Sequence, residues 1–436
     1  MAKGDLTKVY NQLLLASQDP VLFLAIKEEA SLLSENDILI MKLCKALVNL
    51  MVYRLEDARK LALELYNNAI IRSDNQLTIM NLLTLSGICA KTADIPNMHI
   101  YQREAEQLLA NEANSDLHLL LSCHKASAIL RNADFMDAEE IAEQVKKGVV
   151  NVVHPFVRAD LLVWIGGFYN TLRKIDIALD YYSLAYDLCT SHKMNLFSMG
   201  ICIETLSLWA QLKKIEMAER FYNQGLELIQ QLRIPFFNVG LNFNYAMLRK
   251  HLEDFEASVF FYKKSLDALA ESKVDLPQTT VNICNNLANV LNNMGKGEEA
   301  LVYQLQAEQL LARTQDKEME VNLSANIGLT MMNLGRWEEA IYRFKAAARY
   351  HRQHNNLVPL SRITRAMVLY YQERKDYLRG FAMHNRLDSI NQELIASIQN
   401  ENVKNSSLKL ERILADSRAL KEKYDQIGRA SCRERV

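Results

Sequence analysis

The segment that decides the fold is NLGRWEEAIYRFKAAARYH, residues 333–351. We interpret it as the end of one helix, a tight turn at Gly335 and a second helix. In the second helix Ala340, Phe344 and Ala347 are spaced i, i+4 and i+7, so they share one face. A unit of two helices is too small to bury that face alone, so it needs neighbours of the same kind.

The chain repeats this unit at a nearly constant interval. Residues equivalent to Ala340 occur at Ala58, Met98, Ala138, Ala178, Ala218, Ser258, Ala300, Ala340 and Gly380. They are 40 residues apart except for one step of 42. A small residue twelve positions earlier recurs at Ala46, Ser86, Ala126, Gly166, Ala246, Ala288 and Gly328, whereas Leu206 is the exception. Small side chains at both positions allow two antiparallel helices to approach closely.

Two segments resemble the tetratricopeptide-repeat family: ANIGLTMMNLGRWEEAIYRFKAAARY, residues 325–350, and LLVWIGGFYNTLRKIDIALDYYSLAYDL, residues 161–188. The usual repeat of that family has about 34 residues. A period of 40 predicts longer helices, as in the longer-repeat bacterial members. The resemblance implies an all-α, right-handed α-solenoid of about nine antiparallel helix pairs over residues 39–400. We expect residues 1–38 to form N-terminal capping helices.

Composition narrows the class of protein. The 436 residues include only 6 prolines and 14 glycines, which favours helix almost throughout. The net charge of -1 does not indicate the basic surface that binds nucleic acid. Charged residues interrupt the apolar stretches, so no membrane span is predicted. The start of the chain does not resemble a secretory signal, so we expect a cytoplasmic protein. The seven cysteines show no metal-ligand spacing and are predicted to be small buried residues.

No catalytic group is predicted, and no cofactor or metal. The segment GKGEE, residues 295–299, lacks the spacing of a phosphate-binding loop and occupies the position of the turn at Gly335. His351 and His354 are spaced i, i+3 but no further ligand follows them. We therefore expect the residues present to bind a partner and to perform no reaction.

Asparagine is crowded into the first helices of the sixth to eighth repeats, at Asn242, Asn244, Asn282, Asn285, Asn286, Asn289, Asn292, Asn293, Asn322, Asn326 and Asn333. Asparagine is a poor helix former, because its amide competes for backbone hydrogen bonds. The resemblance implies that first helices line a concave surface that binds peptides. The predicted peptide-binding residues are Asn244, Asn282, Asn285, Asn286, Asn289, Asn322, Asn326, Arg362 and Arg365.

Each residue type in this set suits a peptide. A carboxamide both donates and accepts hydrogen bonds, so it pairs with an extended backbone, and the two arginines are suited to a carboxylate. Two other interpretations stay open. The asparagines could form hydrogen bonds between adjacent repeats, or they could face water without a role.

The pattern changes after residue 400. Leu410, Ile413, Leu420 and Ile427 are among the residues that repeat with the 3–4 spacing of a short coiled coil. Residues 401–426 are thus predicted to form a coiled or linker helix, with a possible homodimer through residues 408–427. The last ten residues, IGRASCRERV (427–436), resemble an artefactual tail, and we leave them out of the fold prediction.

Two functional hypotheses follow. The first is a peptide- or protein-binding module that serves as the sensory or scaffolding part of a bacterial signalling protein. The second is the truncated N-terminal sensory region of a diguanylate cyclase or sensor kinase, to which the layout of the chain is similar. The GGDEF motif of the cyclases is absent from the sequence.

Overall fold

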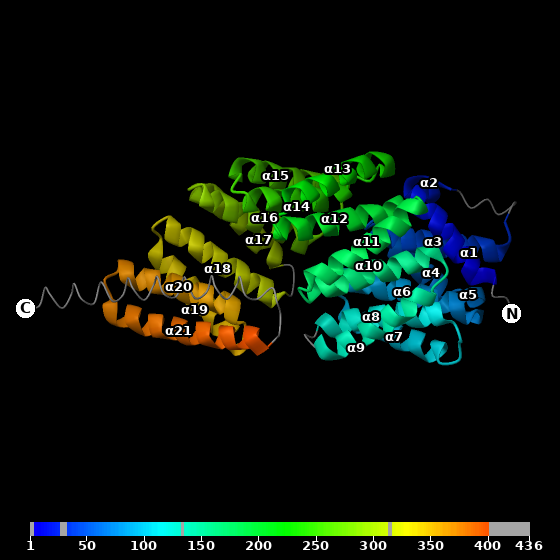
Figure 1. The fold of residues 1–436 in the computed structure, drawn as a ribbon, viewed down its shortest axis with the longest axis horizontal. Helices are drawn as coiled ribbons and strands as arrows, with labels where there is room; N and C mark the ends of the chain where they lie inside the picture. The colour runs from blue at the N-terminus through cyan, green and yellow to red at the C-terminus, as the bar shows by residue number, and fades with distance from the viewer. Residues whose placement is uncertain (1–3, 27–32, 132–134, 313–315, 401–436) are drawn as a thin grey trace, which may run out of the picture. The chain divides into compact units, whose positions relative to one another are not determined.

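The computed structural model describes residues 4–26, 33–131, 135–312 and 316–400. Those residues form helices, turns and loops with no strand among them, and they contain nine antiparallel helix pairs (Figure 1). The predicted all-α solenoid of about nine pairs is confirmed. The chain divides into two compact units, Met1–Val274 with six pairs and Asp275–Val436 with three, which we call unit 1 and unit 2.

Each repeat consists of a first helix and a second helix. The first helices are α3 (Glu35–Met51), α6 (Asn75–Lys91), α8 (Ser115–Arg131), α10 (Pro155–Thr171), α12 (Asn195–Gln211), α14 (Phe237–His251), α16 (Pro277–Asn293), α18 (Lys317–Asn333) and α20 (Leu357–Glu373). The second helices are α4 (Leu55–Tyr66), α7 (Ile95–Leu109), α9 (Phe135–Gly148), α11 (Ile175–Ser191), α13 (Ile215–Leu232), α15 (Phe255–Ser272), α17 (Gly297–Leu311), α19 (Trp337–Gln353) and α21 (Tyr377–Asn400).

Four further helices lie outside the pairs: α1 (Gly4–Gln18), α2 (Pro20–Ala25), α5 (Ala69–Ser73) and the 3₁₀ helix η1 (Val149–Asn151). The second helices begin 40 residues apart, with a single step of 42 between the starts of α15 and α17. This spacing is the one expected from the sequence repeat.

One turn geometry joins the two helices of a pair. The second residue after the first helix has a positive φ at Tyr53, Ala93, Arg173, Lys213, Glu253, Gly295, Gly335 and Lys375. At Gly335 the amide of Gly335 donates to Met332 O and that of Arg336 to Met331 O, at 3.0 and 2.8 Å. This is the Schellman pattern, which satisfies two carbonyls at the helix end. Only two of these eight positions are glycine. At the other six, the left-handed conformation costs free energy because Cβ lies close to the following carbonyl oxygen.

The two helices of a pair meet at small residues. The repeat markers are buried in every pair, at Ala58, Met98, Ala138, Ala178, Ala218, Ser258, Ala300, Ala340 and Gly380. A Cβ atom at Gly328 would lie 2.8 Å from Cε1 of Phe344, and one at Gly166 would lie 2.9 Å from Cδ1 of Tyr182. Both rings are fully buried. The aromatic ring of the second helix therefore fills the space that a side chain at the glycine would occupy.

Gly328→Ala tests this packing. We expect the free energy of unfolding to fall by about 1 kcal/mol, because overpacking against Phe344 outweighs the gain in helix propensity. The matched control is Gly200→Ala in α12, where a Cβ would meet nothing within 4 Å and where the variant should gain up to about 1 kcal/mol. Urea denaturation of both variants measures the difference, and equal stabilisation of the two would contradict this packing.

Helix α1 lies on the first helices of unit 1. It packs against α3, α6, α10 and α12, which belong to four different repeats. Its buried face consists of Leu6, Val9, Tyr10, Leu13 and Ala16, and this spacing is that of one side of a helix. At its end Asn195 Nδ2 donates to Gln18 O at 3.3 Å, and Arg233 pairs with Asp19 at 2.9 Å. The residues predicted to form a terminal cap therefore also reach the fifth repeat.

Leu13→Asp should detach α1 while the helix pairs remain folded. Leu13 is 1% exposed and Leu15 on the same helix is 63% exposed, so Leu15→Asp is the matched control. An unpaired buried carboxylate costs more than the 1.4 kcal/mol that corresponds to a factor of ten. Amide hydrogen exchange in residues 6–18 should therefore accelerate about tenfold or more in Leu13→Asp alone. Unchanged exchange in that variant would mean that α1 does not depend on this face.

The sequence also led to predictions about the cysteines, about membrane-spanning helices and about the C-terminal residues. The six cysteines of the described chain, Cys44, Cys89, Cys123, Cys189, Cys202 and Cys284, are buried and free, which confirms the prediction for these six, whereas Cys432 lies outside the described residues. In the described part of the chain, no helix combines the length and apolarity needed to cross a bilayer. The linker helix, the dimer contact and the tail predicted over residues 401–436 lie outside the described residues, so they stay predictions.

Candidate functional site

The first helices form the inner side of each unit. First helices of neighbouring repeats contact one another, as in α16 with α18 and α18 with α20. A second helix reaches the next repeat through that repeat's first helix, as in α17 with α18 and α19 with α20. The first helices of neighbouring repeats are thus closer to one another than the second helices are. The first helices therefore lie on the inside of the curve of each unit. We call the surface that they present away from their second helices the inner face.

In unit 1 the inner face carries acidic groups beneath α1. Asp160 of α10 and Asp116 of α8 act electrostatically on the buried phenol of Tyr10 in α1. Burial, together with these two carboxyl groups, raises the pKa of Tyr10. Burial also raises the pKa of Asp160 to about 6, and it raises the pKa of Asp116. A carboxyl group under α1 thus holds its proton more tightly than one in water.

The pKa of Asp160 predicts how the stability of unit 1 depends on pH. The folded chain binds this proton more tightly than the unfolded chain, so its contribution is favourable at low pH and is lost as pH rises through about 6. Asp160→Asn should raise the free energy of unfolding at pH 8 by about 1–3 kcal/mol and change it little near pH 4. Urea denaturation at both pH values measures this, and an equal effect at the two would contradict the prediction.

In unit 2 part of the predicted set is accessible on the inner face. Asn282, Asn322 and Arg362 occupy equivalent positions of α16, α18 and α20, each 40 residues apart. Asn282 and Arg362 are exposed, and Asn322 and Asn289 are half-buried. Among the described residues no protein hydrogen bond engages the side-chain amides of Asn282, Asn289 and Asn322. These three amides therefore offer both donors and acceptors on this surface.

Other members of the set form hydrogen bonds within the protein. Asn326 is buried, and its Nδ2 donates to Oδ1 of Asn285 in the preceding repeat at 2.8 Å. In unit 1, buried Asn244 donates in the same way to Ile203 O of the preceding first helix, also at 2.8 Å. Asn286 donates within its own helix to Asn282 O at 2.9 Å. Bonding between repeats, the first alternative to peptide binding, thus accounts for Asn244, Asn285 and Asn326.

Asn292, another of the crowded asparagines, belongs to a polar network that joins the same repeats. Asn292 Nδ2 donates to Oγ1 of Thr330 at 2.7 Å, and Thr330 Oγ1 donates to Oε1 of Gln304 at 2.7 Å. Thr330 and Gln304 are fully buried. Neither threonine at position 330 nor glutamine at position 304 is unusual in a helix. The network becomes visible only where α16, α17 and α18 pack together. Its bonds hold two repeats in register.

Arg362 and Arg365 both lie on α20. Arg362 is exposed, whereas Arg365 is half-buried and occupies the position equivalent to Asn285 two repeats earlier. Arg365 is three residues after Arg362 on the helix, so the two side chains lie on neighbouring parts of one face. Their predicted role as anchors for a carboxylate stays a prediction.

The histidine pair does not form a common site. His351 is fully buried in α19, where burial lowers its pKa, and His354 is exposed and lies 2.9 Å from Tyr350 O. Within the described residues no group of three or more His, Cys, Asp or Glu side chains is placed to hold a metal ion.

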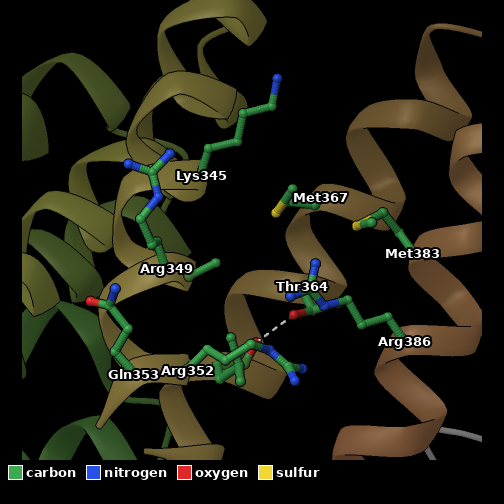
Figure 2. Close-up of a pocket in the computed structure, with 10 residues that line it drawn as sticks. Lys345, Arg349, Arg352, Gln353, Thr364, Met367, Met383 and Arg386 are labelled. Carbon is green, nitrogen blue, oxygen red and sulfur yellow. Dashed lines mark hydrogen bonds between the residues drawn. The ribbon is translucent and has the colours of Figure 1, made fainter.

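The structure also contains a pocket that the sequence did not suggest. It lies among α19, α20 and α21, encloses about 360 Å³ and is lined by several basic side chains (Figure 2). Lys345, Arg349 and Arg352 follow one another at i, i+4 and i+7 on α19, which is a spacing visible in the sequence. Arg386, the fourth cation, comes from α21, so only the packing of the helices brings the group together.

No protein-family model and no curated protein matches the sequence. Among solved structures, the chain is similar to a Rap protein complexed with Competence and Sporulation Factor, at 14% identity and a TM-score of 0.59 over 82% of this chain and 98% of that chain. It is also similar to the apo form of the quorum sensor NprR from B. thuringiensis, at 15% identity and a TM-score of 0.52 over 79% and 99% of the two chains.

A third similar structure is a signal transduction ATPase with a tetratricopeptide repeat sensor from Pyrococcus horikoshii. It is 11% identical with a TM-score of 0.53, and the match covers 98% of this chain and 64% of that chain. At these identities the similarities concern the fold. Together with the helix pairs described above, they show that the chain has a fold of stacked helical repeats similar to that of tetratricopeptide-repeat structures.

Proposed function

We propose that the chain is a peptide- or protein-binding repeat module and that the inner face of unit 2 binds an extended peptide segment. The observation that carries the proposal is the position of α1. In unit 1 the inner face already holds a segment of the chain that comes from outside the helix pairs, and it buries one face of that segment. The corresponding face of unit 2 presents exposed Asn282 and Arg362, so a segment from another molecule has access to it.

The accessible side chains suit a peptide backbone. Asn282 and Asn289 are seven residues apart on α16, which corresponds to about 10 Å along the helix. Asn322 extends the same surface onto α18. Each carboxamide donates to a peptide carbonyl and accepts from a peptide amide, so this surface binds backbone without demanding one sequence. Arg362 and Arg365 on α20 add charge-assisted hydrogen bonds to a carboxylate at one end.

The similar structures support a role in signalling. One is a Rap protein with a bound factor, one is described as a quorum sensor, and one carries a repeat sensor on a signal transduction ATPase. We extend this to the chain as the sensory or scaffolding part of a signalling protein.

The proposal is tested by selecting octapeptides from a displayed library against the full chain and measuring the affinity of the best one by fluorescence anisotropy. The variant Asn282→Ala, Asn289→Ala, Asn322→Ala should bind this peptide about tenfold more weakly or worse, because each lost hydrogen bond contributes about 0.5–1.5 kcal/mol. Its melting temperature should be unchanged or higher, since alanine is the better helix former.

Asn326→Ala is the matched control, because Asn326 is buried between repeats. It should lower the melting temperature and change the affinity little. If the triple variant binds the selected peptide as tightly as the unmodified chain, the inner face of unit 2 is not the site. If no peptide is selected, the proposal fails as a whole.

A further inference from the structure

The pocket of unit 2 lies on the opposite side of the repeats from the inner face. Its walls are the second helices α19 and α21, and its floor is the side of α20 that faces them, with Thr364 and Met367. Figure 2 shows Arg352 and Arg386 extending from the two walls toward the segment of α20 that carries Thr364. Thr364 Oγ1 donates to Leu360 O at 2.7 Å, so the hydroxyl hydrogen is already used within α20.

The preceding repeat shows why space opens here. Between α17 and α19, Arg343 pairs with Glu308 through two contacts of 2.7 and 3.3 Å. The equivalent residues 40 positions later are Met383 and Ala348. Both of these residues line the pocket. A long ion pair that crosses the groove is thus replaced by a flexible thioether and a methyl group, which leaves the cavity of about 360 Å³.

The charge of this groove also differs from that of the preceding groove. Lys345, Arg349, Arg352 and Arg386 line the pocket, and none of them forms an ion pair within the described residues. The residues one repeat earlier are all uncharged: Leu305, Gln309, Ala312 and Ala346. Four cations around one cavity repel one another, and an anion that enters it removes that repulsion.

We infer that this pocket binds an extended acidic peptide segment that carries an apolar side chain between its carboxylates. The cations Lys345, Arg349 and Arg352 extend over seven residues of α19, or about 10 Å. An extended chain rises about 3.3 Å per residue, so about three residues of a bound segment pass along them. A single phosphate would need all the donors to converge on one point. Arg352 and Arg386 extend toward one segment of α20, but Lys345, Arg349 and Arg352 are distributed along α19.

The rest of the pocket defines the apolar part of the ligand. Met367 and Met383 both line the pocket (Figure 2), and thioether side chains adapt to apolar groups of different shapes. Arginine binds carboxylates through two parallel hydrogen bonds, and Arg352 and Arg386 supply one such group from each wall. This site is independent of the amides on the inner face.

The probe for this inference is the fluorescein-labelled peptide Asp-Glu-Leu-Glu-Asp-Met-Glu-Asp, compared with the same peptide in which Asn and Gln replace the acidic residues. The full chain should bind the acidic peptide alone, and binding should weaken as ionic strength rises. The double variant Arg352→Ala, Arg386→Ala should bind about tenfold more weakly or worse. Lys296→Ala, an exposed cation of unit 2 outside the pocket, should bind as the unmodified chain does.

A second variant keeps the test informative if the double variant unfolds. Ala348→Glu combined with Met383→Arg rebuilds the ion pair of the preceding repeat and should close the pocket, abolish binding and preserve the melting temperature. Failure of the acidic peptide to bind, or undiminished binding by these variants, overturns the inference. Competition by inorganic phosphate as strong as that by unlabelled peptide would also overturn it, in favour of a small-anion site. Loss of binding in the inner-face triple variant alone would assign the peptide to the other site.

Discussion

The close contact between the two helices of each pair is the constraint on which the structure depends. A small residue on each helix allows the backbones to approach, and an aromatic ring such as Phe344 or Tyr182 fills the adjacent space. The same turn geometry then fixes where the second helix begins, because the residue at Gly335 and its equivalents is left-handed in eight repeats of the described chain. With the pair geometry fixed, stacking follows from burial of the remaining apolar face of each pair.

Stacking gives the repeats two faces with different chemistry. On the inner side of unit 1 the surface is apolar and acidic and is covered by α1, whereas in unit 2 it is rich in amides. On the outer side, the pair of Arg343 with Glu308 crosses the groove between α17 and α19, whereas the groove between α19 and α21 has Met383 and Ala348 at these positions. A solenoid can change one such groove without altering its neighbours, since each repeat touches only the next.

The asparagines illustrate how one residue type serves two purposes on one helix. Asn326 and Asn285 face each other across adjacent first helices, where a buried amide must find a partner. Asn282 and Asn322 lie about one turn away from them and reach the surface. Asparagine lowers helix propensity at all of these positions, and the bonds between repeats offset part of that cost only for the first two.

The sequence by itself determined the repeat, the number of helix pairs, the turn at Gly335 and the close packing at Gly328, because all of these depend on residues near one another in the chain. It also identified the helices that carry the amides. Only the tertiary structure decided which asparagines are bonded between repeats, that α1 crosses to the fifth repeat, and that Arg386 joins three cations of α19. Those results depend on residues that are between 34 positions apart, as for Arg352 and Arg386, and 214 positions apart, as for Asp19 and Arg233. A local pattern of side chains contains no information about such contacts.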